Sequence, residues 1–317
     1  MPFRSRNCWL STVIRQLWLV ITVAGIAGCG STSDHPTDET PARITIAVSS
    51  YPLLVMTERM GGDAVDVEWV IRGETTSPYW NPTSDAVHRM QQATRILISG
   101  ADYEPWLQRV TLPRSRLTDT ARGYSDQLVR IPDAVIHQHG PDGGHSHPGV
   151  VWATWLDPLL AASQMEQTRD VLLEILPDYE SRIRGEADRL AEEFRRLDTR
   201  LETIAAAHVD NEITVLGDAP VYQYLTQRLG WELKYLHLPP RGPLSAEDRQ
   251  ILTKRIGEYQ PAVVFVRSTL AVELDELRGD SNVPFVVIDL CDFEDEERTL
   301  VQRMNRNLDE IQRRMSP

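Results

Sequence analysis

The feature that most constrains the fold is a long amphipathic stretch, Asp178 to Ala207, which lies between two groups of short apolar runs. Pro177 precedes it, and Gly185 is the only helix-weakening residue inside it. At 1.5 Å per residue its thirty residues extend about 45 Å, which is longer than one small lobe needs. Apolar residues recur every three or four positions, as one stripe on one helical face: Tyr179, Ile183, Ala187, Leu190, Phe194, Leu197, Leu201 and Ile204. The pattern favours a strut between two lobes over a coiled coil.

Short apolar runs on both sides of this stretch are separated by segments of helix length. Before it they lie at 44–49, 65–71 and 96–99, and after it at 213–216, 232–236, 263–266 and 285–289. Such alternation is typical of parallel sheets covered by helices on both faces. It predicts an α/β protein with two doubly wound lobes joined by one long rigid helix. We expect ligands at the carboxyl ends of the strands or between the lobes.

The N-terminal residues predict export. Arg4, Arg6 and Arg15 precede an apolar run from Leu17 to Ala27, which contains no acidic residue. The run is too short for a permanent transmembrane helix, which needs roughly 20 residues. It ends in Ile-Ala-Gly-Cys, which resembles a bacterial lipobox and predicts a lipid on Cys29. An ordinary signal followed by a chance cysteine is the alternative.

These observations divide the chain into five parts. We expect a lipoprotein signal peptide at 1–28, a polar tether at 29–42, an N-terminal α/β lobe at 43–176, a connecting helix at 177–208 and a C-terminal α/β lobe at 209–317. Without the signal, 30 Lys and Arg residues face 46 Asp and Glu residues, a net charge of −16. That charge disfavours nucleic acid and is compatible with a cation as ligand. Cys291 is then the only thiol that carries no lipid, so no intramolecular disulfide is expected.

Four of the eight histidines lie in one Gly- and Pro-containing loop, residues 135–148, with the sequence VIHQHGPDGGHSHP. They are His137, His139, His145 and His147. Imidazole suits Zn²⁺, and the flexible backbone allows several rings to surround one ion. We therefore predict a metal site in this loop. A polar insertion that binds nothing is the alternative.

Several further motifs together resemble one family. They are Gly61-Gly62-Asp63, Asn81-Pro82-Thr83, GADYEPWL at 100–107, LPRSRL at 112–117, TWLDP at 154–158 and VYQYL at 221–225. In this combination the chain resembles the solute-binding proteins of zinc and manganese ABC transporters (ZnuA/TroA-like). The resemblance implies an exported, membrane-anchored binding protein without catalytic activity. It also implies that the transported ligand is zinc, with manganese as the alternative, and that the partners are an ABC permease and its ATPase.

The family's metal ligands do not carry over to this sequence. At the positions that hold ligands in the family, this chain has Tyr79, Ala153, Ala219 and Arg267, and only Asp289 is a plausible counterpart. An alanine cannot bind a metal, and Arg267 would oppose a cation if it pointed into the interlobe cleft. It could instead pair with Asp289 or receive an anion. A shifted register, with Asp218, His237 or Tyr79 as ligand, is the alternative.

The sequence leaves two other functions open. The first is a solute-binding scaffold that has lost its ligands and acts as an accessory or interaction lipoprotein. The second is an enzyme, which the absence of Gly-x-Ser-x-Gly, Walker and dinucleotide-binding motifs disfavours. Among the remaining candidates, we expect His88 to be an exposed helix residue, His208 to end the connecting helix and Asp157 to cap a helix. Trp80, Trp106 and Trp155 are expected to be core or lobe-packing aromatic residues.

Overall fold

The computed structural model describes residues 44–71, 77–131, 149–240, 244–273, 277–278, 281–295 and 297–315, and the backbone of 136–138 and 144–146. The predicted signal peptide, the tether and Cys29 lie outside the described residues, as do His139 and His147. In the part of the chain that is described, no helix combines the length and the apolar character needed to cross a membrane.

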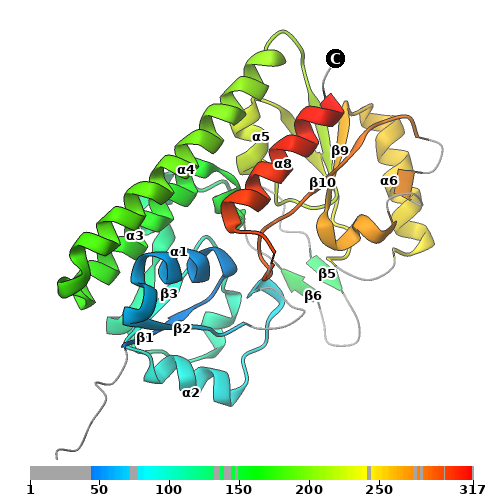
Figure 1. Cartoon of the computed structure of the whole chain (residues 1–317). Helices are drawn as coiled ribbons and strands as arrows, with labels where there is room; N and C mark the ends of the chain where they lie inside the picture. The colour runs from blue at the N-terminus through cyan, green and yellow to red at the C-terminus, as the bar shows by residue number, and fades with distance from the viewer. Residues whose placement is uncertain are drawn as a thin grey trace, which may run out of the picture. The chain divides into compact units, whose positions relative to one another are not determined.

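The first lobe is built on a parallel sheet with strand order β2-β1-β3-β4. Its strands are β1 (Ile44–Val48), β2 (Val65–Trp69), β3 (Arg95–Ile98) and β4 (Leu117–Asp119). The helices are α1 (Tyr51–Gly61), α2 (Ser84–Gln92) and α3 (Pro158–Ile175). Figure 1 shows α1 and α2 on opposite faces of the sheet. The short 3₁₀ helices of this lobe are Gly62–Ala64, Ser77–Tyr79, Pro105–Arg109, Arg114–Arg116, Thr120–Gln127 and Thr154–Leu156.

Local sequence explains where the helices of this lobe begin. Ser50 and Thr83 cap α1 and α2, because each side chain accepts a hydrogen bond from a backbone amide in the first turn. Asp157 does the same for α3, accepting from the Leu159 amide at 2.8 Å, and Pro158 occupies the first helical position. The prediction that Asp157 caps a helix is confirmed.

The second lobe repeats this plan with strand order β10-β9-β7-β8, again all parallel. Its strands are β7 (Thr214–Gly217), β8 (Glu232–Tyr235), β9 (Val263–Arg267) and β10 (Phe285–Ile288). Its helices are α5 (Gln223–Leu229), α6 (Ala246–Tyr259) and α8 (Leu300–Met315), with a 3₁₀ helix at Ser268–Glu273. In Figure 1, α6 lies on the opposite side of the sheet from α5 and α8. The predicted fold class, two α/β lobes and a connecting helix, is confirmed.

The predicted connecting helix is α4 (Glu180–Ala207), preceded by a 3₁₀ turn at Pro177–Tyr179. It packs against α1 and α3 of the first lobe and against α5 and α8 of the second (Figure 1). Every residue of the predicted stripe is buried except Tyr179, which precedes the helix and is exposed. The opposite face carries ion pairs between residues three or four apart, such as Arg184 with Glu180 at 2.7 Å.

The hydrophobic core is continuous along α4. One large cluster of buried side chains contains residues from β1, the α4 stripe, β9, β10 and α8. A second cluster lies between the second sheet and α6, and a smaller third one includes Tyr124 and Tyr224. Residues 43–317 accordingly form one compact unit. The two lobes therefore share one core, because the buried stripe on α4 joins them.

Three strands were not predicted from the sequence. β4 is only three residues long, too short for an apolar pattern to stand out. β5 (Ile136–Gln138) and β6 (Gly144–Ser146) form a two-stranded antiparallel sheet within the histidine-rich segment 135–148.

Candidate functional site

Charged residues gather at the carboxyl ends of the strands of the second sheet. Asp218 directly follows β7, Arg267 is the last residue of β9, and Asp289 and Asp292 follow β10. Because carboxyl ends of parallel strands share one edge of a sheet, these side chains are brought together by the topology. This is the edge at which the sequence predicts a ligand.

Arg267 makes a buried ion pair with Asp218. Its Nε donates to Asp218 Oδ2 at 2.8 Å, and its Nη2 donates to the carbonyl oxygens of Leu238 and Pro239 at 2.8 and 3.1 Å. Arg267 is only 6% exposed. Burial alone would lower the pKa of Arg267, but Asp218, together with Tyr222 and Tyr79, more than offsets this and raises the pKa above its ordinary value. The sequence suggested that Arg267 would pair with Asp289 or receive an anion. In the structure it pairs with Asp218 instead.

Asp218 is fully buried and has a second partner. The Tyr222 hydroxyl donates to Asp218 Oδ1 at 2.5 Å, so both carboxylate oxygens accept a hydrogen bond. Burial, followed by the neighbouring carboxylate, raises the pKa of Tyr222 well above its usual value. Tyr79 comes from the first lobe and is 49% exposed, yet burial around its hydroxyl raises its pKa, and it feels the charges of Arg267, Asp292 and Asp218.

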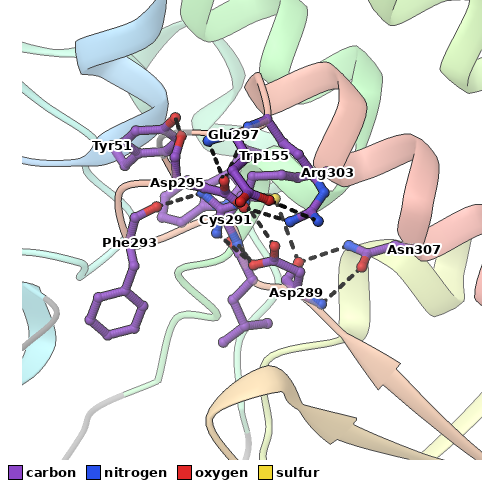
Figure 2. A network of polar contacts seen from close by, with 11 residues as sticks. Tyr51, Trp155, Asp289, Cys291, Phe293, Asp295, Glu297, Arg303 and Asn307 are labelled. Atoms are coloured by element: carbon purple, nitrogen blue, oxygen red, sulfur yellow. Dashed lines mark hydrogen bonds and ion pairs between the residues drawn. The ribbon is translucent and has the colours of Figure 1, made fainter. Parts of the chain in front are cut away.

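Asp289, the predicted metal-binding carboxylate, is paired with Arg303 of α8. Nε of Arg303 donates to Oδ2 at 2.7 Å and Nη2 donates to Oδ1 at 2.7 Å, the two-pronged geometry typical of guanidinium and carboxylate (Figure 2). The backbone amide of Cys291 also donates to Oδ1, at 2.9 Å. Asn307 exchanges two hydrogen bonds with the Asp289 backbone. Both oxygens of this carboxylate are therefore held by protein donors.

Asp292 is the site residue that sequence reasoning missed. It is 6% exposed, and burial raises the pKa of its carboxyl to about 7. Its own backbone amide lowers that pKa, Asp289 raises it, and the charges of Arg303 and Arg267 lower it. The sequence did contain a signal for Asp292. It lies three residues after Asp289, behind the same apolar run, in VVIDLCD.

Two of the substituted family positions are closed off by packing. Ala153 and Ala219 are both buried and belong to the large hydrophobic core. Neither side chain has an atom that can bind a metal. The described residues therefore place apolar methyl groups and paired charges where the sequence resemblance leads one to look for a four-ligand metal site.

The segment after β10 also ties the two lobes together. Trp155 Nε1 of the first lobe donates to the carbonyl oxygen of Leu290 at 2.7 Å (Figure 2). The guanidinium of Arg303 lies 5.1 Å from the centre of the Tyr51 ring, a cation–π contact between α8 and α1. Trp155 and Trp106 are fully buried and Trp80 packs against the core, so the prediction that these tryptophans are core residues is confirmed.

The three described histidines whose side chains can be placed do not form a metal site. His88 is exposed on α2, as predicted. His208 ends α4, as predicted, and its ring packs edge-on against Trp231. His237 packs edge-on against Tyr235. Across the described residues, no group of three or more His, Cys, Asp or Glu side chains is arranged to hold a metal ion.

Two short backbone stretches of the histidine-rich segment lie side by side as strands. β5 and β6 pair in antiparallel fashion, and His137 lies directly opposite His145 in the register. Positions opposite one another in such a pair are those from which two side chains can reach a common ligand. The predictions for His139 and His147 fall outside the described residues.

A further buried carboxylate, that of Glu104, lies in the first lobe. Ser49 Oγ donates to it at 2.5 Å, and the amides of Ser99 and Gly100 donate to it at 2.9 and 3.0 Å. Burial raises the pKa of Glu104 to about 8, against the opposing effect of these donors. Its partners fix the turn after β3, where Gly100, Ala101 and Asp102 have positive φ angles of 71°, 51° and 59°. We assign Glu104 to this turn and not to a ligand site.

Two parallel-sheet lobes, a helix that spans both of them and charged side chains at the strand ends define the class of two-lobed solute-binding receptors with a helical backbone. The chain belongs to the ZnuA family, described as the periplasmic component A of a zinc-uptake complex, which matches residues 46–314. The resemblance stated from the sequence motifs is therefore confirmed.

The chain is similar to individual members at low identity. It is 27% identical to the zinc-binding lipoprotein AdcA of Streptococcus pneumoniae over 164 residues, which is 49% of this chain and 32% of AdcA. It is 20% identical to the iron-binding protein YfeA of Yersinia pestis over 270 residues, 80% of this chain and 79% of YfeA. The match thus spans about a third of the length of AdcA.

Solved structures share the fold. Zn(II)-bound AdcA from Streptococcus pneumoniae aligns with a TM-score of 0.69 at 19% identity, covering 87% of this chain and 58% of AdcA. The metal-dependent lipoprotein YcdH from Bacillus subtilis also aligns with a TM-score of 0.69, at 16% identity over 86% of this chain and 99% of YcdH. FpvC of Pseudomonas aeruginosa, in complex with Mn²⁺, aligns with a TM-score of 0.66 at 16% identity, covering 86% of this chain and 98% of FpvC.

Proposed function

We propose that this protein is the substrate-binding lipoprotein of a zinc ABC import system. It captures the ion outside the cytoplasmic membrane and delivers it to a permease that is driven by an ATPase. Its role is binding and not catalysis. Membership of the zinc-uptake family supports this function, and the relatives named as zinc-binding or bound to Mn²⁺ support zinc as cargo with manganese as the alternative.

We assign the capture of the ion to His137, His139, His145 and His147. The observation that carries this assignment is the pairing of Asp218 with Arg267 and of Asp289 with Arg303, which engages the carboxylates at the strand ends. Neutral imidazoles are suitable zinc ligands, and the register that sets His137 opposite His145 favours one shared ion. Asp289 is left as a structural partner of Arg303.

Equilibrium dialysis tests this assignment. We expect the chelator-stripped mature protein to take up zinc at pH 7.5, and a variant with all four histidines of the segment changed to Ala to lose most of it. The matched control changes His88, His208 and His237 to Ala and is expected to bind zinc as the parent does. Unchanged stoichiometry and affinity in the fourfold variant would mean that another site holds the ion.

The second candidate function is a scaffold that binds no metal and serves as an accessory lipoprotein. The same observation favours it, because the strand-end carboxylates are already neutralised by arginines. It predicts no zinc uptake at micromolar concentration even when the histidine segment is intact. The parent protein in the dialysis experiment therefore separates the two functions.

We further propose that the mature chain begins at Cys29 and is held to the membrane by a lipid on that residue. The sequence around Cys29 supports this, as does the similarity to a relative named as a lipoprotein. Mass spectrometry of the N-terminal peptide from the membrane fraction tests it. A diacylglycerol-modified Cys29 is expected, and an unmodified peptide that starts elsewhere contradicts it.

A further inference from the structure

Arg267 lies among polar side chains at the strand ends of the second sheet. We call the buried Asp218, Tyr222, Arg267 and Asp292, together with the half-exposed Tyr79, the Arg267 cluster. We propose that the guanidinium of Arg267 is the resident cation of this cluster and that it excludes divalent metal ions from the carboxylates of Asp218 and Asp292. Removing it is expected to create a site for a hard divalent cation such as Mn²⁺.

The contacts of Arg267 are those that a bound cation would make. Its guanidinium touches one carboxylate oxygen and two backbone carbonyl oxygens, at 2.8, 2.8 and 3.1 Å. The second carboxylate, Asp292, is close enough for the charge of Arg267 to lower its pKa. The atoms of the described residues that accept hydrogen bonds from this guanidinium are oxygens. Carboxylate and carbonyl oxygens are the ligands that Mn²⁺, Mg²⁺ and Ca²⁺ prefer.

Asp292 is an independent sign that the cluster can take a cation. It is more than nine-tenths buried, and its own backbone amide is the hydrogen-bond donor described for its carboxyl. A buried carboxylate is poorly compensated unless hydrogen-bond donors or a positive charge lie nearby. Arg267 and Arg303 supply that charge. Arg303 already donates hydrogen bonds to Asp289 through both Nε and Nη2.

Charge balance explains the exclusion. A divalent ion that entered beside Arg267 would face a fixed positive charge within a few ångströms in a water-poor interior, where like charges repel strongly. Without the guanidinium, the carboxylates of Asp218 and Asp292 and the carbonyls of Leu238 and Pro239 would lose their counter-charge. A divalent ion could then replace it, held by the Asp218 carboxylate and the two carbonyl oxygens, with the charge of Asp292 nearby.

Mn²⁺ binding to a full-length mature protein in which the four histidines of segment 135–148 are Ala tests the proposal. With Arg267 in place we expect no bound ion by equilibrium dialysis and by electron paramagnetic resonance. Arg267→Met in the same background is expected to bind one Mn²⁺ per chain. Its affinity for Mn²⁺ should exceed that of the protein with Arg267 by at least about a hundredfold. Arg267→Lys keeps the charge and should still exclude the ion.

Two further variants make the result specific. Arg267→Met combined with Asp218→Asn lacks one carboxylate and should lose the binding that Arg267→Met gained. Arg228→Met breaks a different part-buried ion pair, with Asp198, and should bind no Mn²⁺. Arg267→Met is expected to be less stable than the parent without metal and to regain stability when Mn²⁺ is added.

Three outcomes overturn the proposal. They are Mn²⁺ bound while Arg267 is present and the four histidines are absent, a folded Arg267→Met protein that binds none, and an Arg267→Met protein that stays unfolded even when refolded with Mn²⁺. The experiment does not depend on zinc capture by the histidines. Its failure therefore leaves the dialysis test of the proposed function unaffected.

Discussion

At the residue scale, two arginines determine what the strand ends can do. Arg267 and Arg303 each hold a buried or half-buried carboxylate in short hydrogen bonds, and Asp292 lies within the field of both. Breaking such a pair by removing one partner costs about 3–5 kcal/mol, because a charge is left buried and uncompensated. This edge of the second sheet is therefore an internally neutralised site.

The raised pKa of Asp292 makes stability depend on pH. Its pKa is about 7 in the folded protein against a usual 3.8, so the folded state binds more protons than the unfolded state between those values. Its contribution is fully present below about pH 4 and is lost as pH rises through 7, with an upper limit on the order of 4 kcal/mol.

We therefore predict that Asp292→Asn gains stability relative to the parent as pH rises from about 5 to about 8, as measured by urea unfolding at both values. Asp188→Asn, which changes an exposed residue of α4, serves as the control and should follow the parent at both pH values. A stability difference between Asp292→Asn and the parent that is the same at pH 5 and pH 8 would contradict the burial of this carboxyl.

The sequence identified the right strand ends but not their pairing. Arg267 and Asp289 were singled out because they stand at positions that hold ligands in the family, and the apolar runs before them marked strand ends. Which carboxylate meets Arg267 depends on the order of β7, β9 and β10 in the sheet, a non-local property. The choice of Asp218 over Asp289, and the burial of Asp292, could not be deduced from the chain alone.

At the element scale, α4 carries the architecture. Its spacing of apolar residues predicted the helix and its buried stripe, because a 3.6-residue period with no Pro is a strong local signal. The three-residue strand β4 gives no comparable signal and was missed. What the period could not indicate is that one stripe would serve both lobes, so that their cores merge along it.

Leu197 tests the role of this stripe. It is buried near the middle of α4 and lines a small apolar cavity with Leu201, Leu225 and Met304. We predict that Leu197→Ala lowers the free energy of unfolding by about 2–5 kcal/mol, because it removes packed methyl groups beside an existing void. The neighbouring Arg196→Ala changes an exposed side chain and should stay within about 0.5 kcal/mol of the parent. Equal losses in urea unfolding would contradict the burial pattern of α4.

At the scale of the whole molecule, the fold of a two-lobed metal receptor is combined with strand ends whose charges are already satisfied. Family membership and fold point to metal uptake. The described residues, however, contain no cluster of three or more His, Cys, Asp or Glu side chains that could hold a metal ion. We propose that metal capture belongs to the histidine-rich segment, where β5 and β6 set His137 opposite His145. On this proposal the two lobes would serve docking and delivery, and the binding chemistry would lie on the segment between β4 and α3.

Zinc K-edge X-ray absorption on the mature protein loaded with one equivalent of zinc at pH 7.5 tests this claim most directly. If the histidines capture the ion, we expect nitrogen ligands at about 2.0–2.1 Å from the zinc, with strong imidazole scattering. This signal should be lost in the fourfold histidine variant. A shell of oxygen ligands without imidazole scattering would contradict it, because the ion would then lie on carboxylates such as Asp218, Asp289 or Asp292.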